Sequence, residues 1–240
     1  MFNKRSENIF VIDKQMGDVN GDEIVDTVYL VGESENELFY EKLNLIIRDG
    51  KTMQSYIIPL AEGYNKAYNP WLFLGNFTTL ESQQIMINLP TGGSGGLTYY
   101  FLFSFEENQI KTILSPKKDQ NPFGDLIFKV NYEDDYKVLV ENEVLGQFYR
   151  LDVRDREDSY KGIFYNEKGE LIKPLKGFVI EFPLLTPIRF DGKELYRLQA
   201  QQSIAGTSMA DRLGYAMTYW EYDQQNGNWD LNPDMFFMIV

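Results

Sequence analysis

Apolar and polar residues alternate over short stretches along the whole chain, and β-branched and aromatic residues are concentrated in those stretches. Such runs are typical of β-strands, whereas an amphipathic helix needs a period near 3.6 residues. In the first half of the chain the predicted strands span 9–14, 27–32, 43–48, 54–60, 71–76, 84–89, 98–105 and 109–114. In the second half they span 126–132, 136–141, 147–153, 177–182, 195–201, 215–223 and 235–240.

Turn residues stand between many of these strands. Asp49-Gly50 and Asn226-Gly227 are pairs that tolerate positive φ and therefore favour hairpins. Helical periodicity is weak, and one short helix is predicted at about 208–214, where a capping-box-like spacing begins. The pattern predicts an all-β fold in a single domain over residues 1–240, because all-β folds often use this length as one unit.

A strand–loop–strand layout recurs three times, in units near 17–32, 74–89 and 187–202. In each unit a polar loop separates one apolar strand from the next, although the spacing between units is irregular. Repeated units of a few strands are typical of β-propellers and related multi-sheet folds. The predicted architecture is therefore propeller-like and built from imperfect strand–loop–strand repeats.

Composition narrows the possible chemistry. Of the 240 residues 43% are hydrophobic and 25% are charged, and the chain contains neither Cys nor His. It therefore has no disulfide scaffold, no Cys or His zinc ligands, no Cys nucleophile and no triad that uses imidazole. The formal net charge of −13 argues against nucleic acid as a partner, because such binding requires a basic surface. Cations are the natural small partners of so acidic a protein, although its charge also serves solubility alone.

The sequence contains no apolar stretch of about eighteen residues, so we expect no membrane span. The first eight residues also lack the apolar core of a signal peptide. We therefore expect synthesis in the cytosol.

One loop carries a pattern with defined chemistry. Asp18, Asn20, Asp22 and Asp26 occupy positions 1, 3, 5 and 9 of the loop, and the backbone carbonyl of Ile24 falls at position 7. Calcium takes six to eight oxygen ligands, and calcium loops supply them at this spacing. The flanking segments are strands and the twelfth position lacks the bidentate Glu, so the loop is not an EF-hand. The spacing predicts one Ca²⁺ site, and the alternative is a connector rich in Asx turns.

The other two units depart from this pattern. The corresponding positions of the second unit hold Asn76, Thr78, Leu80 and Gln84. Those of the third unit hold Arg189, Asp191, Lys193 and Arg197. Either these loops have drifted after losing a metal, or the cations of the third unit pair with nearby acids in the place of the metal.

The stretch 17–30 resembles the FG-GAP/VCBS repeat of integrin-like β-propellers. Shorter stretches in the same order extend the resemblance to VCBS-repeat proteins of spore-forming Firmicutes, some of them labelled spore coat proteins. These stretches lie within 68–77, 91–105, 163–169, 187–188 and 201–215. The resemblance implies a β-propeller with calcium in its loops, a structural or adhesive role at the spore surface or outside the cell, and partners such as coat proteins, further copies of itself or glycans. Only the five residues of the first loop match the metal motif.

Other functions remain open. Six aromatic residues are candidates for stacking on sugars or anchoring a partner protein, or else for ordinary core packing. They are Trp71, Tyr99, Tyr100, Tyr219, Trp220 and Trp229. A glycoside hydrolase needs only two carboxylates, which the acidic clusters at 133–135 and 155–158 contain, although both clusters resemble solvated surface. The Gly-rich stretch 91–96 lacks the Lys-Ser/Thr of a phosphate-binding loop. The sequence thus favours a non-enzymatic structural or surface-associated protein, with a carbohydrate- or protein-binding adhesion module as the alternative.

Overall fold

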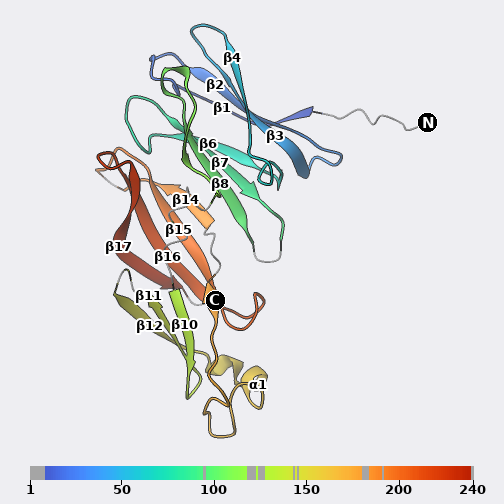
Figure 1. Ribbon diagram of the computed structural model, residues 1–240, viewed down its shortest axis with the longest axis vertical. Helices are drawn as coiled ribbons and strands as arrows, with labels where there is room; N and C mark the ends of the chain where they lie inside the picture. The colour runs from blue at the N-terminus through green and yellow to red at the C-terminus, as the bar shows by residue number, and fades with distance from the viewer. Residues whose placement is uncertain are drawn as a thin grey trace, which may run out of the picture. The chain divides into compact units, whose positions relative to one another are not determined.

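The computed structural model describes residues 9–93, 96–117, 123, 128–142, 144, 146–179, 184–190 and 192–238. Among these residues the chain forms seventeen strands and one short α-helix, α1 (Glu157–Tyr160) (Figure 1). The all-β prediction is confirmed. The helix predicted near 208–214 is wrong, because the N–H of Asp211 binds the carbonyl of Ser208 in a tight turn and β16 (Arg212–Asp223) begins directly afterwards.

The first half of the chain forms two antiparallel meanders. The first sheet has the strand order β1-β2-β3-β4, and a short β5 pairs with β3. Its strands are β1 (Ile9–Gly17), β2 (Asp26–Glu33), β3 (Phe39–Arg48), β4 (Ser55–Pro59) and β5 (Ala67–Tyr68). The second sheet has the order β6-β7-β8-β9. Its strands are β6 (Trp71–Gly75), β7 (Gln84–Pro90), β8 (Thr98–Ser104) and β9 (Lys111–Leu114), and the short 3₁₀ helix η1 (Glu106–Asn108) precedes β9.

Two further sheets follow. A three-stranded sheet consists of β10 (Phe128–Glu133), β11 (Lys137–Asn142) and β12 (Gln147–Asp152). The 3₁₀ helix η4 (Arg154–Arg156) and α1 come directly after it. The last sheet has the order β13-β15-β16-β17, and β14 also pairs with β15. Its remaining strands are β13 (Phe178–Val179), β14 (Leu184–Ile188), β15 (Arg197–Ala205) and β17 (Asn228–Met238). The predicted strands at 126–132, 177–182 and 235–240 extend partly beyond the described residues.

The chain divides into two compact units. Unit 1 consists of Met1–Asn121, Pro187–Arg197 and Glu221–Asp230, and unit 2 of Pro122–Thr186, Leu198–Trp220 and Leu231–Val240. Because β15, β16 and β17 each contribute residues to both units, the single domain over 1–240 stays a prediction. The described strands form four separate sheets, and no closed ring of propeller blades is shown among them. No helix in the described part of the chain is long and apolar enough to cross a membrane.

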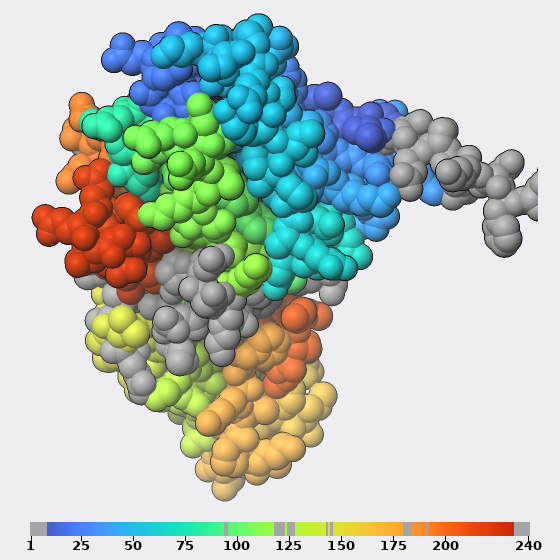
Figure 2. All heavy atoms as spheres, turned by 45° about the horizontal axis from the view of Figure 1, so that its top comes forward, coloured from blue at the N-terminus to red at the C-terminus, as the bar shows by residue number. Residues whose placement is uncertain are grey.

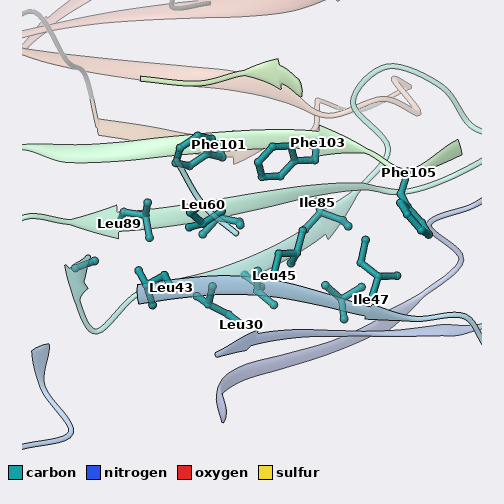
Figure 3. Packing of buried hydrophobic residues seen from close by; sticks show 14 of the residues in the cluster. Leu30, Leu43, Leu45, Ile47, Leu60, Ile85, Leu89, Phe101, Phe103 and Phe105 are labelled. Atoms are coloured by element: carbon teal, nitrogen blue, oxygen red, sulfur yellow. The ribbon is translucent and has the colours of Figure 1, made fainter. Parts of the chain in front are cut away.

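The core of unit 1 lies between its two meanders. In β3, Leu43, Leu45 and Ile47 alternate with more exposed residues and are almost completely buried. They pack in one cluster with residues of β7 and β8, among them Phe101 and Phe103 (Figure 3). Alternate residues of a strand point to the same side of its sheet, so each meander contributes one face to this core. Burial of each such side chain contributes about 1.5–3 kcal/mol.

Candidate functional site

The predicted metal loop connects β1 to β2 and is built from Asx turns. The two carboxylate oxygens of Asp18 accept hydrogen bonds from the N–H groups of Gly21 and Glu23, each at 2.7 Å. Asn20 Oδ1 accepts a hydrogen bond from the N–H of Asp22 at 3.1 Å, and Asp22 Oδ1 accepts one from the N–H of Ile24 at 2.9 Å. Short polar side chains commonly hold loops in this way. The loop therefore supplies its own partners for these oxygens.

Asp26 closes the loop from the first position of β2. Its side chain is completely buried and accepts hydrogen bonds from the N–H of Val19 at 3.0 Å and of Gly50 at 2.9 Å. Burial raises the pKa of the Asp26 carboxyl above its usual value, although the two N–H groups oppose this shift. Only Gly fits at position 50, since a Cβ there would lie 2.1 Å from the carbonyl oxygen of Val25. The predicted Asp49-Gly50 turn thus serves to bring a backbone N–H to Asp26.

The arrangement of these acids bears on the calcium prediction. No group of three or more acidic side chains in the described ranges is placed to hold a metal ion. Asp18, Asp22 and Asp26 are therefore not gathered around a common point, and Asp22 lies 3.7 Å from the ammonium of Lys51. Calcium binding at Asp18, Asn20, Asp22, Asp26 and the Ile24 carbonyl stays a prediction. Thermal melts with calcium and with chelator, for the wild type and Asp22→Ala, would test it.

The second loop has the same geometry with a neutral side chain. Gln84, the first residue of β7, is completely buried, and its Oε1 accepts the N–H of Phe77 at 2.7 Å and of Thr78 at 2.9 Å. Its Nε2 donates to the carbonyl of Ser82 at 3.0 Å. Gln84 binds the N–H seven residues earlier, as Asp26 does in the first loop. An amide that both donates and accepts thus closes this loop, and no charge is buried.

The third loop is closed by a cation. Arg197, the first residue of β15, pairs with Glu221 on the neighbouring strand and lies 5.2 Å from the ring centre of Phe190. Phe190 precedes it by seven residues, so the spacing of the other two loops recurs. Arg189 lies 5.6 Å from the ring centre of Tyr196. Asp191 lies outside the described residues, so its predicted pairing is not part of this comparison.

The acidic clusters considered for hydrolysis bind within the chain. Glu133 accepts hydrogen bonds from the guanidinium of Arg150, the shorter one at 2.8 Å. Asp134 Oδ1 accepts the N–H of Leu171 at 2.8 Å, and Asp155 lies 3.9 Å from the neighbouring Arg156. Glu133 and Asp134 thus hold strands and turns together, whereas Asp155 is largely exposed. The prediction that the protein is not an enzyme stays a prediction.

Most of the predicted stacking aromatics belong to the packing of the chain. Tyr100, Trp220 and Trp229 are buried, Tyr99 and Tyr219 are partly buried, and Trp71 is 37% exposed. Trp220 Nε1 donates to Thr218 Oγ1 at 2.9 Å, and its ring meets Phe123 edge-on. In the Gly-rich stretch, residues 94 and 95 lie outside the described residues. These six residues therefore do not form a shared exposed platform.

Unit 2 contains a polar cluster that the sequence did not predict. Asp211 accepts hydrogen bonds from Tyr132 at 3.1 Å, from Tyr160 at 2.5 Å and from Arg156 at 2.7 Å. Burial raises the pKa of the Tyr132 and Tyr160 hydroxyls above their usual values, and the hydrogen bonds to Asp211 add to the shift. The cluster ties the turn before β16 to α1. Asp211 lies more than fifty residues along the chain from its three partners, so local spacing gives no signal for the cluster.

Several exposed apolar side chains of unit 1 lie on the outer face of the first sheet, which we define as the side of β1–β4 that points away from the core. Four of its side chains are strongly exposed: Ile9 (72%), Val11 (62%), Met16 (62%) and Ile57 (67%). Alternation and strand register place Tyr29 and Ile46 between them, and both are partly buried. In Figure 2 the blue to cyan atoms of β3 and β4 lie at the surface of the molecule. A signal for this face exists in the sequence, because β1 and β4 carry apolar residues at consecutive positions and not only at alternate ones.

Comparison with known proteins identifies the relatives of the chain. Residues 126–236 match the family described as YybI C-terminal domain. YybI of Bacillus subtilis (strain 168) is 34% identical over 216 residues, which cover 90% of this chain and 80% of that protein.

These matches overturn the resemblance to FG-GAP/VCBS repeat proteins and the labels that rested on it alone, namely the repeat family, the calcium-binding propeller repeats of that family and the spore coat. The Ca²⁺ site expected from the spacing of the first loop is a separate prediction. The resemblance rested on short turn motifs, which recur in unrelated β proteins because Gly, Asp and Asn suit the same backbone conformations. The loops also differ, since Asp26, Gln84 and Arg197 close them with three different chemistries. The chain belongs to the YybI family.

Proposed function

We propose that the protein is a non-enzymatic binding module that recognises another protein through the outer face of its first sheet. The observation that carries the proposal is the exposure of Ile9, Val11, Met16 and Ile57 on one side of one sheet. Contiguous apolar surface of this kind is uncommon on monomers and is typical of interaction sites. Covering each such side chain contributes up to about 1.5–3 kcal/mol, so four of them can support a stable contact.

The chemistry of the face favours a protein over a sugar or a nucleic acid. Its exposed side chains are aliphatic, whereas sugar sites depend on flat aromatic rings. Lys14 and Arg48 are exposed on the same face, but the net charge of −13 opposes binding to a polyanion. An aliphatic centre with a few charges around it is the usual composition of a protein–protein interface.

Site-specific photo-crosslinking tests the proposal. A photoreactive amino acid at position 57 is compared with the same amino acid at position 80, where Leu80 is 55% exposed on a loop of the same unit. In the cells that naturally make the protein, we expect covalent adducts to protein from position 57 and few from position 80. Equal yields at the two positions would contradict the proposal, because they would show no preference for the outer face.

A further inference from the structure

We propose that the partner bound at the outer face is a second copy of this chain, packed face to face about a two-fold axis; this inference rests on the proposed function. The argument comes from the order of charged and apolar side chains along the sheet. It concerns unit 1 alone, since all four strands of the face belong to that unit.

One end of the outer face is acidic. Ile9 lies opposite Glu33, and Glu33 lies opposite Glu41 on the next strand. Glu33 also pairs with Lys42 at 2.7 Å. The hairpin that continues from this end adds Glu35 and Glu37, both exposed. The segment 33–42 thus contains four Glu and one Lys.

The half of the outer face opposite to the acidic end carries the cations. Arg48 lies opposite Thr27 in the last row, and Lys14 lies opposite Tyr29 in the row before it. Of the acids in the nearby 18–26 loop, Asp18 binds loop N–H groups, Asp22 lies 3.7 Å from the ammonium of Lys51 and Asp26 is buried, whereas Glu23 is exposed. Along β2, Arg48 lies about six residues from the acidic pair and Lys14 about four, which corresponds to about 20 Å and about 13 Å.

The middle of the outer face is apolar. Val11, Val31, Asn44 and Pro59 form one row across the four strands. Tyr29, Ile46 and Ile57 form the next row, with Lys14 at its β1 end. A surface with an acidic end, an apolar middle and a basic end is complementary to itself after a rotation of 180° about an axis through the middle. With that axis running across the strands, Glu41 of each copy faces Arg48 of the other, and Lys14 lies one row and one strand away from Glu33.

Self-complementarity is needed here because two copies repel each other overall. Each carries a net charge of −13, so an interface without paired charges would meet unfavourable repulsion. Like charges placed opposite each other would also suppress the wrong orientations of the second copy. The charge order therefore selects both the partner and its orientation.

Charge reversal tests the inference with two matched variants of the full chain. Variant A carries Lys14→Glu and Arg48→Glu, and variant B carries Glu33→Lys and Glu41→Lys. By sedimentation velocity we expect the wild type to dimerise and each variant alone to dissociate with at least a tenfold higher dissociation constant. An equimolar mixture of A and B should form a heterodimer, because every basic end then faces an acidic one.

Circular dichroism of each variant shows whether the fold is intact. Ile57→Asp with the control Leu80→Asp gives a second test, in which the charged residues of the two ends are unaltered and both variants gain the same single charge. We expect Ile57→Asp to be monomeric and Leu80→Asp to dimerise. A wild type that remains monomeric at all concentrations, or folded A and B that do not associate when mixed, would overturn the two-fold dimer. Adducts of position 57 to a different protein would then still support the proposed function, so the two failures are distinguishable.

Unique cysteines provide a test of orientation. The natural chain contains no Cys, so Arg48→Cys and Glu41→Cys each introduce a single thiol. In the two-fold arrangement, oxidation of a mixture should link position 48 of one copy to position 41 of the other. Links of 48 to 48 and of 41 to 41 in equal yield would overturn the proposed orientation.

Discussion

The two faces of the first sheet contain the same kinds of side chain in different surroundings. On the inner face Leu45 and Ile47 are completely buried against the second sheet. On the outer face Val11 and Ile57 are about two-thirds exposed. An antiparallel sheet with one solvated face normally carries polar residues on that face. The difference indicates that the inner face stabilises the fold, whereas the outer face is suited to bind something beyond its own chain.

The largest effect is expected on the inner face. Leu45→Ala removes a completely buried side chain from the centre of the unit 1 core and should lower the free energy of unfolding by about 2–5 kcal/mol. Urea denaturation followed by circular dichroism measures this change. A loss below about 1 kcal/mol would show that the inner face is not the main source of stability.

A smaller loss is expected at the end of the inner face, where Asp26 closes the first loop. Asp26→Ala leaves the buried N–H groups of Val19 and Gly50 without their acceptor and should cost about 1–3 kcal/mol. Asp18→Ala is the matched control, because the hydrogen bonds of Asp18 are exposed to water. Equal losses for the two variants in urea would contradict the role assigned to Asp26.

Asp26 should also make the free energy of unfolding depend on pH. Burial raises the pKa of Asp26, so the folded protein holds this proton more tightly than the unfolded chain. The contribution of Asp26 to the free energy of unfolding is therefore greatest below about pH 4 and falls as the pH rises through the raised pKa. The difference in unfolding free energy between the wild type and Asp26→Asn should decrease accordingly from about pH 3 to pH 7.

Asp49 offers a control of opposite sign for this pH series. Its pKa is lowered, chiefly by the backbone N–H of Thr52. Its contribution is therefore present above the unfolded pKa near 4 and is lost as the pH falls. The difference between the wild type and Asp49→Asn should increase with pH. Parallel slopes for the two variants would show that these shifts do not arise from their local environments.

The smallest effect on folding is expected on the outer face. Ile57→Ala should change the free energy of unfolding of the monomer by no more than about 0.5 kcal/mol, because the side chain is 67% exposed. The same substitution should raise the dissociation constant of the dimer at least tenfold. Urea melts at low protein concentration and sedimentation velocity separate the two quantities. A large loss of monomer stability would place Ile57 in the core and remove the contrast between the faces.

Much of the strand content could be predicted from the sequence because it depends on local patterning. The alternation in β3 and the turn at Asp49-Gly50 both correspond to observed structure. The short strands β5 and β14 were missed, since two to five residues carry too little pattern. The relation between the first two loops was also visible, because Asp26 and Gln84 stand at the same place relative to their strands.

What the sequence could not provide depends on contacts between distant residues. Asp211 was predicted as part of a helix start, yet it binds Tyr132 and Tyr160, which lie 79 and 51 residues away. The acidic spacing at 18–26 could be satisfied either by a cation or by backbone N–H groups, and only three-dimensional geometry distinguishes the two. The outer face likewise required the register that brings Ile57 next to Ile46 and Tyr29.

Hydroxyl-radical footprinting at increasing protein concentration tests the central claim most directly, because it reports on individual side chains. If two copies meet at the outer face, oxidation of Met16, Tyr29 and Ile57 should decrease as the concentration rises through the dissociation constant. Oxidation of Leu80, on the loop between β6 and β7, should stay constant. Unchanged oxidation of all four residues up to the highest concentration would contradict the claim that the outer face is where copies of this chain associate.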